Sequence, residues 1–251
     1  MRQKKSDGNG NHFRALKNTS LRSRVSEILR ESIFSGKLQS GDPLKEIQLA
    51  RQFQVSQSTV RESLLQLEHD GLVVRVPNRE TRVTKLSTKE VCERLVLRSL
   101  LEELAGVEAS RRMKEGDFRI LEQECEKLSR ALEGNDYYKA AQADLSFHRF
   151  IWKQSGNQTL YSVLDRLMTA VFAFVSILQS YQQTNLEDVV SPHMEIITAI
   201  RKGDRELIRV TMCCHIETFY GELMELELSN PPVRDLGQGL SFVDKGGVAD
   251  Q

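Results

Sequence analysis

Apolar residues recur at helical spacing in the first part of the chain. The pattern predicts a helix that begins near Thr19 or Ser20, either of which can cap it, and ends at Gly36. Shorter helical patterns cover residues 45–53 and 57–69, with a tight turn at Gln54-Val55-Ser56 between them. Three short helices in this order are typical of a compact helical domain.

The apolar period changes to two after Gly71. Apolar residues alternate over 72–76 and again over 81–83, and the turn residues Pro77 and Asn78 lie between, which predicts a β-hairpin. Three helices followed by a hairpin predict a winged helix-turn-helix, which binds DNA through its third helix. The alternative is a small helical subdomain with no nucleic-acid partner.

The rest of the chain, from residue 87 to about 230, has helical spacing throughout. Breaks at Gly134, Gly156 and Gly203 divide it, and the fifth segment begins either near Asn185 or at Ser191. The six expected helices cover 88–113, 117–133, 136–154, 157–181, 185–202 and 205–228. The fold class is therefore mainly α, with the winged helix-turn-helix ahead of an all-α antiparallel helical bundle.

We expect four segments in all. A flexible basic arm covers 1–18, the winged helix-turn-helix covers 19–86, the bundle covers 87–230, and a disordered tail covers 231–251.

The net charge of zero conceals an asymmetry. Residues 1–86 hold 16 Lys+Arg against 9 Asp+Glu, whereas the remainder holds 19 against 26. A basic first third could face a polyanion, although uneven surface charge alone is the simpler explanation.

Targeting and membrane signals are missing from this sequence. The first 18 residues contain no apolar stretch of a signal peptide, and the most apolar run, 167–178, is shorter than the ~20 residues that span a bilayer. The four cysteines form no CxxC pair, so free thiols are expected. These features predict a cytoplasmic protein with no membrane partner.

Three of the five histidines belong to a candidate metal site. Asp144 and His148 are four apart and share one helix face, and His193 and His215 could join them from other helices. One carboxylate and three imidazoles suit a divalent ion such as zinc, nickel, manganese or iron. Alternatively, each histidine is an ordinary residue satisfied by hydrogen bonds.

The start of the third helix carries the candidate DNA-binding side chains. Ser56 can cap this helix, while Gln57, Ser58 and Arg61 face outward together near its N-terminal end. Arg61 could instead pair with Glu62 or Glu68. The expected DNA-binding residues, including one in the hairpin, are Ser56, Gln57, Ser58, Thr59, Arg61 and Arg79.

Two stretches of the chain resemble a known regulator family. Residues 19–86 resemble the N-terminal domain of the GntR family of bacterial transcriptional regulators, through GKLQSGDPLKEIQLARQFQVSQSTVRESLLQLEHDGLVVRVPNRETRV. Residues 88–229 resemble the FCD ligand-sensing domain of its FadR-like subfamily, through LRSLLEELA, DLSFH, SGN, PHMEIITAIRKGD and the late His215. Six predicted helices make this domain similar to the VanR-type branch.

The resemblance implies a homodimeric regulator that binds a palindromic operator in double-stranded DNA. It also implies a small carboxylate effector held by a metal in the bundle, with Asp144, His148, His193 and His215 as ligands. Arg98 stands where the family has an arginine that points toward the effector. A surface salt bridge between Arg98 and Glu102 is the alternative.

The sequence departs from the family pattern at the DNA-binding surface. Gln57 replaces an arginine, Thr59 a proline and Gln54 a glycine. Glu80 stands where the hairpin usually has a glycine, and its charge would be repelled by phosphate unless it faces away or pairs with Arg79 or Arg82.

Two other functions use the same ligands. A metal-dependent enzyme in a helical bundle is possible in principle, but we find no second carboxylate or nucleophile at fixed spacing, and it would leave the basic domain unexplained. In the other alternative, a DNA-binding regulator uses the metal only for structure.

Overall fold

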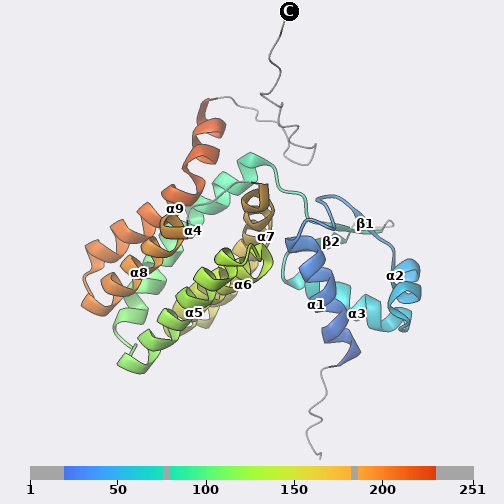
Figure 1. The fold of residues 1–251 in the computed structure, drawn as a ribbon, viewed down its shortest axis with the longest axis horizontal. Coiled ribbons are helices and arrows are strands. Elements are labelled where there is room, and N and C mark those ends of the chain that lie inside the picture. The colour runs from blue at the N-terminus through green and yellow to red at the C-terminus, as the bar shows by residue number, and fades with distance from the viewer. Residues whose placement is uncertain (1–19, 76–79, 182–185, 230–251) are drawn as a thin grey trace, which may run out of the picture.

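We analysed a computed structural model, which describes residues 20–75, 80–181 and 186–229 (Figure 1). The expected basic arm at 1–18, the expected tail at 231–251 and Arg79 lie outside the described residues.

The first domain has the predicted winged helix-turn-helix arrangement. Its helices are α1 (Leu21–Phe34), α2 (Glu46–Phe53) and α3 (Gln57–His69), and its strands are β1 (Pro43–Leu44), β2 (Val73–Arg75) and β3 (Thr81–Val83). The hairpin pairs β2 with β3 in antiparallel register, with Val73 opposite Val83. The strand β1 was not predicted; it adds to β3 and gives the sheet order β1-β3-β2.

The core of this domain follows the predicted helical spacing, with two exceptions. Val60, Leu64 and Leu67 of α3 are buried, as expected. Ile28 and Ile47 belong to the apolar spacing that predicts α1 and α2 and were expected to be buried, but both are exposed. Each helix therefore has a narrower buried face than its apolar residues indicate.

The second domain is a bundle of six helices among the described residues. They are α4 (Thr88–Ser110), α5 (Glu115–Glu133), α6 (Tyr137–Gln154), α7 (Gln158–Tyr181), α8 (Leu186–Lys202) and α9 (Arg205–Ser229). Helix α8 begins at the earlier of the two expected positions, so Pro192 lies inside it. Helix α4 begins at a capping box, in which Ser87 and Glu90 satisfy each other's backbone N–H groups.

The two domains pack against each other along α1, α6 and α7 (Figure 1). One buried apolar cluster runs through both, joining Leu29 and Leu72 of the first domain to Leu145 and Leu164 of the second. Helix α7 contacts α1 of the first domain as well as α4 and α6 of the bundle. Within the described residues, no helix is long and apolar enough to cross a membrane.

Candidate functional sites

Three helices bring the four predicted metal ligands together. Helix α6 supplies Asp144 and His148, α8 supplies His193, and α9 supplies His215. One ligand atom from each residue lies within 4.8 Å of all the others. The His193 Nε2 is 3.0 Å from Asp144 Oδ1, and the His148 Nε2 is 3.4 Å from the same oxygen and 3.1 Å from His215 Nε2. Four side chains distant in sequence thus point at one small volume.

A hydrogen bond behind His193 and a carboxylate behind His148 orient these two rings toward this volume. His193 Nδ1 donates to the Val189 carbonyl at 2.8 Å, which leaves Nε2 free of a proton. Arg98 Nη2 lies 3.0 Å from His148 Nε2 and can only donate, so His148 Nε2 accepts and the His148 proton is on Nδ1. That Nδ1 is 3.2 Å from Glu102 Oε1.

The donor set fits a divalent metal ion. The three histidines are buried, and burial lowers the pKa of His148 and, further, of His215, which favours the neutral form that binds metals. Burial opposes ionisation of Asp144, but the neighbouring His193, His148 and Arg98 outweigh burial, and the Asp144 pKa is lowered. Ligand atoms at about 2.1 Å from one ion lie about 3.0–4.2 Å apart, and the contacts of 3.0, 3.1 and 3.4 Å between these ligand atoms fall in that range. The bound ion and its identity stay predictions.

A buried ion pair behind the ligands is the part of the site that sequence reasoning missed. Arg98 Nε donates to Glu102 Oε1 at 3.1 Å, and both side chains are at most 1 % exposed. The pairing that we gave as the alternative for Arg98 is therefore present, but it is not a surface salt bridge, because the pair lies inside the bundle. Trp152 Nε1 also donates to Glu102 Oε1 at 3.1 Å, and Phe172 lies 5.0 Å below the Arg98 guanidinium.

Glu102 is ionised in this setting. Burial raises its pKa, but the charge of Arg98 and the contact with His148 outweigh burial and lower the pKa to about 2. The spacing carried a signal for this cluster: Glu102 is four residues after Arg98, and Trp152 is four residues after His148, so each pair shares a helix face.

Asn157, Tyr161 and Gln182, three polar residues in or beside α7, are further candidates for this site, but the first two lie elsewhere. Asn157 accepts a bond from the Leu160 backbone at the start of α7, and Tyr161 lines a groove between α7 and the hairpin. Gln182 lies outside the described residues. Cys213 and Cys214 diverge from His215 on the helix and are expected from their position to be packing residues. Cys213 is half-buried, but Cys214 is exposed, so this expectation is wrong for Cys214.

The start of α3 presents its predicted residues to solvent. Ser56 caps the helix by accepting from the Thr59 N–H at 3.2 Å, and Ser58 and Thr59 hydroxyls lie 2.8 Å from Ser56 Oγ. Gln57 and Ser58 are exposed. This helix start therefore offers an array of hydroxyl and amide groups rather than cations.

Arg61 forms an ion pair that we did not anticipate. Its Nη2 donates to Glu46 Oε2 of α2 at 2.8 Å, so the expected competitors Glu62 and Glu68 are wrong. The Arg61 side chain remains 58 % exposed. The guanidinium is thus anchored to the preceding helix at one edge while it stays accessible to a ligand.

The hairpin and the helix turn accommodate two of the departures from the family pattern. Arg82 Nη2 donates to Glu80 Oε1 at 2.5 Å, so the carboxylate is paired within the hairpin, as one alternative predicted. Gln54 has φ 54°, the left-handed conformation that favours glycine. The side chain that replaces the usual glycine therefore keeps the backbone shape of the turn.

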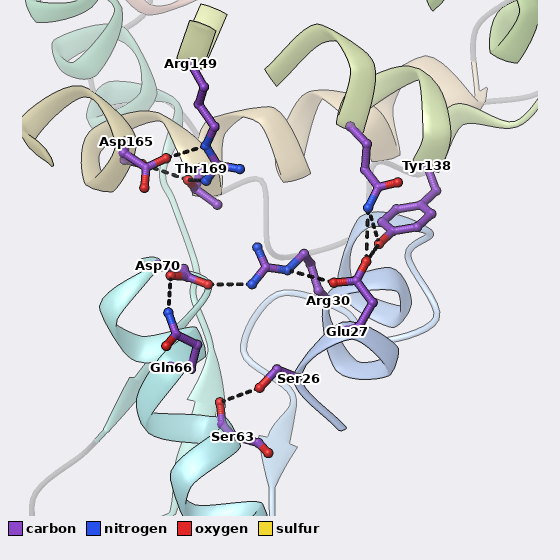
Figure 2. Close-up of polar contacts among 11 residues, drawn as sticks. Ser26, Glu27, Arg30, Ser63, Gln66, Asp70, Tyr138, Arg149, Asp165 and Thr169 are labelled. Atoms are coloured by element: carbon purple, nitrogen blue, oxygen red, sulfur yellow. Dashed lines mark hydrogen bonds and ion pairs between the residues drawn. The ribbon is translucent and has the colours of Figure 1, made fainter. Parts of the chain in front are cut away.

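A polar network joins α6, which supplies two of the candidate ligands, to α1 of the first domain (Figure 2). Glu27 of α1 accepts from the Tyr138 hydroxyl at 2.5 Å and from Gln142 Nε2 at 3.1 Å, both on α6. Within the first domain, Asp70 at the end of α3 accepts from Arg30 of α1 at 2.6 Å. Helix α6 thus contacts α1 through its first turns and carries Asp144 and His148 further along.

The comparisons with known proteins cover both domains. The model of the bacterial regulatory proteins of the gntR family matches residues 21–83, and the FCD domain model matches 93–218.

Curated relatives include the probable D-xylose utilization operon transcriptional repressor of Paenarthrobacter nicotinovorans, 28 % identical over 81 % of this chain and 89 % of the relative. The transcriptional repressor RspR of Escherichia coli is 23 % identical over 82 % and 90 %, and the Glc operon transcriptional activator of the same species is 27 % identical over 81 % and 89 %.

Among solved structures, E. coli McbR/YncC superposes with a TM-score of 0.70 at 21 % identity, covering 85 % of this chain and all of that one. A transcriptional regulator structure from Rhodococcus has a TM-score of 0.63 at 22 % identity, covering 82 % and 99 %. These likenesses show the fold. With both of its domains matched in order, the chain belongs to the GntR family of bacterial transcriptional regulators and carries an FCD domain.

Proposed function

We propose that this DNA-binding regulator responds to a small carboxylate metabolite held at a divalent metal ion in its FCD domain. The observation that carries the proposal is the convergence of Asp144, His148, His193 and His215 on one buried volume. The bound ion would supply a positive centre for the carboxylate of the effector.

Arg98 is the residue we assign to the effector itself. It is buried beside His148, and a guanidinium fork matches a carboxylate. Glu102 holds one side of that fork through Nε, which orients the guanidinium toward the histidines. The name of one relative refers to a D-xylose utilization operon, and a metabolite effector for this chain agrees with that name.

The output would pass through α6 to the DNA-binding domain. This helix supplies two ligands at one point and contacts Glu27 of α1 at another. An effector can change operator affinity only if it binds one arrangement of the two domains better than another. A shift of α6 on effector binding would alter the support of α1 and, through Arg30 and Asp70, of α3.

We further propose that the protein acts as a homodimer on a palindromic operator, because two half-sites multiply an individually weak contact. The exposed start of α3, with Ser56, Gln57, Ser58 and Thr59, would lie in the major groove, and Arg61 and Arg79 would contact the DNA nearby.

The experiment replaces one ligand and measures two outputs. His148→Ala should lose bound metal and the effect of candidate carboxylates on operator binding, while operator affinity without effector stays within a few-fold of the wild type. His69→Ala, which removes an exposed histidine outside the site, is the matched control for metal content. Retention of an effector response with unchanged affinity in His148→Ala would show that the metal-centred proposal is wrong.

Chelation of the wild-type protein separates a structural metal from an effector-binding metal. If chelation of the wild-type protein unfolds the bundle, the metal has the structural role that zinc has in zinc fingers. If the chelated bundle stays folded but no longer responds to carboxylates, the effector role is supported.

A further inference from the structure

Helix α4 (Thr88–Ser110) has a buried inner face and, on the opposite side, an apolar outer face. The inner face packs into the bundle through Leu95, Arg98, Glu102, Ala105 and Ala109, all buried. The outer face carries a second series with the same alternating spacing of three and four residues, namely Leu97, Leu100, Leu104 and Val107. Such spacing makes a continuous apolar seam along one side of a helix.

The outer seam is open to solvent in the single chain. Leu97 is 48 % exposed, Leu100 63 % and Leu104 46 %, and Val107 is half-buried. A surface hollow of about 400 Å³ follows the C-terminal half of the seam, where Arg111 and Arg205 form part of its rim. These residues therefore form one exposed apolar stripe of the kind that marks an interface.

We propose that this seam is the contact with a second copy of the chain. The two α4 helices would lie antiparallel, and the two-fold axis would cross the seam at the level of residue 102. This inference rests on the homodimer in the proposed function and specifies its interface. The seam is symmetric about position 102, so an antiparallel pair places Leu97 opposite the partner's Val107 and Leu100 opposite the partner's Leu104. Every apolar residue of the seam then meets another.

Charge complementarity selects the antiparallel arrangement over the parallel one. Glu93 and Arg111 continue the seam by four residues at its two ends, and each lies about 13.5 Å along the helix axis from position 102. The axis therefore places Glu93 opposite the partner's Arg111, twice per dimer. A parallel pair would instead place two glutamates together at one end and two arginines at the other.

Both end groups are available for this contact. Arg111 Nη1 bonds Glu108 in its own chain but is 66 % exposed, and Glu93 lies 4.0 Å from Lys89 and is 63 % exposed. The inner face of the same helix carries Arg98 and Glu102, so the proposed interface lies directly behind the effector site.

The first experiment measures the oligomeric state of the full chain by sedimentation equilibrium. The wild type should be a dimer, whereas Leu100→Asp/Leu104→Asp should be monomeric at the same concentrations, because the substitutions place two carboxylates at the centre of the seam. Ile120→Asp, an exposed apolar residue on α5, should remain dimeric. Circular dichroism checks that each variant is folded, which is expected since every substituted side chain is exposed.

A charge exchange then tests the orientation. Glu93→Arg and Arg111→Glu should each weaken the dimer about tenfold at low salt, because each creates two like-charge contacts of roughly 0.7 kcal/mol. Glu93→Arg/Arg111→Glu should recover most of the wild-type dissociation constant.

A folded, dimeric Leu100→Asp/Leu104→Asp variant, or a monomeric wild type, would overturn the proposal. Loss of the dimer in that variant without recovery in the charge exchange would overturn the antiparallel orientation. These results are independent of the effector mechanism, which the metal content and effector response of His148→Ala decide.

Discussion

Replacing Glu102 with glutamine removes one negative charge from the centre of the bundle and almost no volume. Glutamine keeps an oxygen that can accept from Trp152, so the change isolates the charge from packing. Arg98, which is 1 % exposed, then has no counter-ion on its Nε side, and His148 Nδ1 faces a neutral group. The structure therefore predicts a loss of both folding stability and metal affinity.

The expected loss of stability is about 3 kcal/mol. A carboxylate whose pKa falls from 4.5 to about 2 on folding contributes roughly this free energy at neutral pH. Removing one member of a buried ion pair costs about 3–5 kcal/mol, which agrees. Metal affinity should fall about 10- to 100-fold, as is usual when the partner behind a ligating histidine is lost.

Urea unfolding of the chelated protein measures the first quantity. Trp152 is the single tryptophan of the chain and bonds Glu102 directly, so its fluorescence reports on this cluster, and circular dichroism provides a second probe. Glu103→Gln is the matched control: the neighbouring carboxylate pairs with Arg205, whose side chain is 78 % exposed. Loss of this exposed ion pair in Glu103→Gln should change the unfolding free energy by less than about 0.5 kcal/mol.

The pH dependence provides an independent check. Because the folded pKa of Glu102 is lowered, its stabilisation is complete above the unfolded pKa of 4.5 and is lost as the pH falls toward about 2. The stability gap between wild type and Glu102→Gln should thus stay constant from pH 7 to about 5 and narrow below that. If Glu102→Gln lowers the unfolding free energy at pH 7 by as little as Glu103→Gln does, the reasoning is refuted.

Three further predictions concern other parts of the chain. Ser56→Ala should destabilise the first domain by about 1 kcal/mol through loss of the α3 cap, measured by thermal unfolding, and a change below 0.3 kcal/mol, on the order of the measurement error, would contradict this. Gly71→Ala should destabilise the protein more than Gly203→Ala. Both glycines are in the left-handed region, with φ of 77° and 70°, but only at Gly71 would the new Cβ meet a backbone oxygen, that of Arg166 at 3.2 Å. Equal losses of unfolding free energy in urea would show that this contact is not the cause. Cys125, whose burial raises its thiol pKa to about 12, should resist a thiol reagent until the protein unfolds, whereas exposed Cys214 should react at once; equal rates in the native state would contradict the burial of Cys125.

The fold was largely predictable because local patterns determine most of it. Helical spacing located the helices to within a few residues, and the change of period after Gly71 located the hairpin. The short strand β1 escaped prediction because two residues carry no period, and it exists only through its pairing with β3. The exposure of Ile28 was missed for a similar reason, since an apolar residue is buried only if another element covers it.

The sequence by itself determined the ligand types and, through the four-residue spacing, the shared face of Asp144 and His148. Only the tertiary structure decided that His193 and His215 reach the same volume, because three separate helices have to pack to bring them there. It also decided that the Arg98–Glu102 pair lies inside the bundle, whereas the identical spacing on a solvent-facing helix would make an ordinary surface salt bridge. Spacing along one helix is a local property, but the side on which a neighbouring helix packs depends on the whole chain.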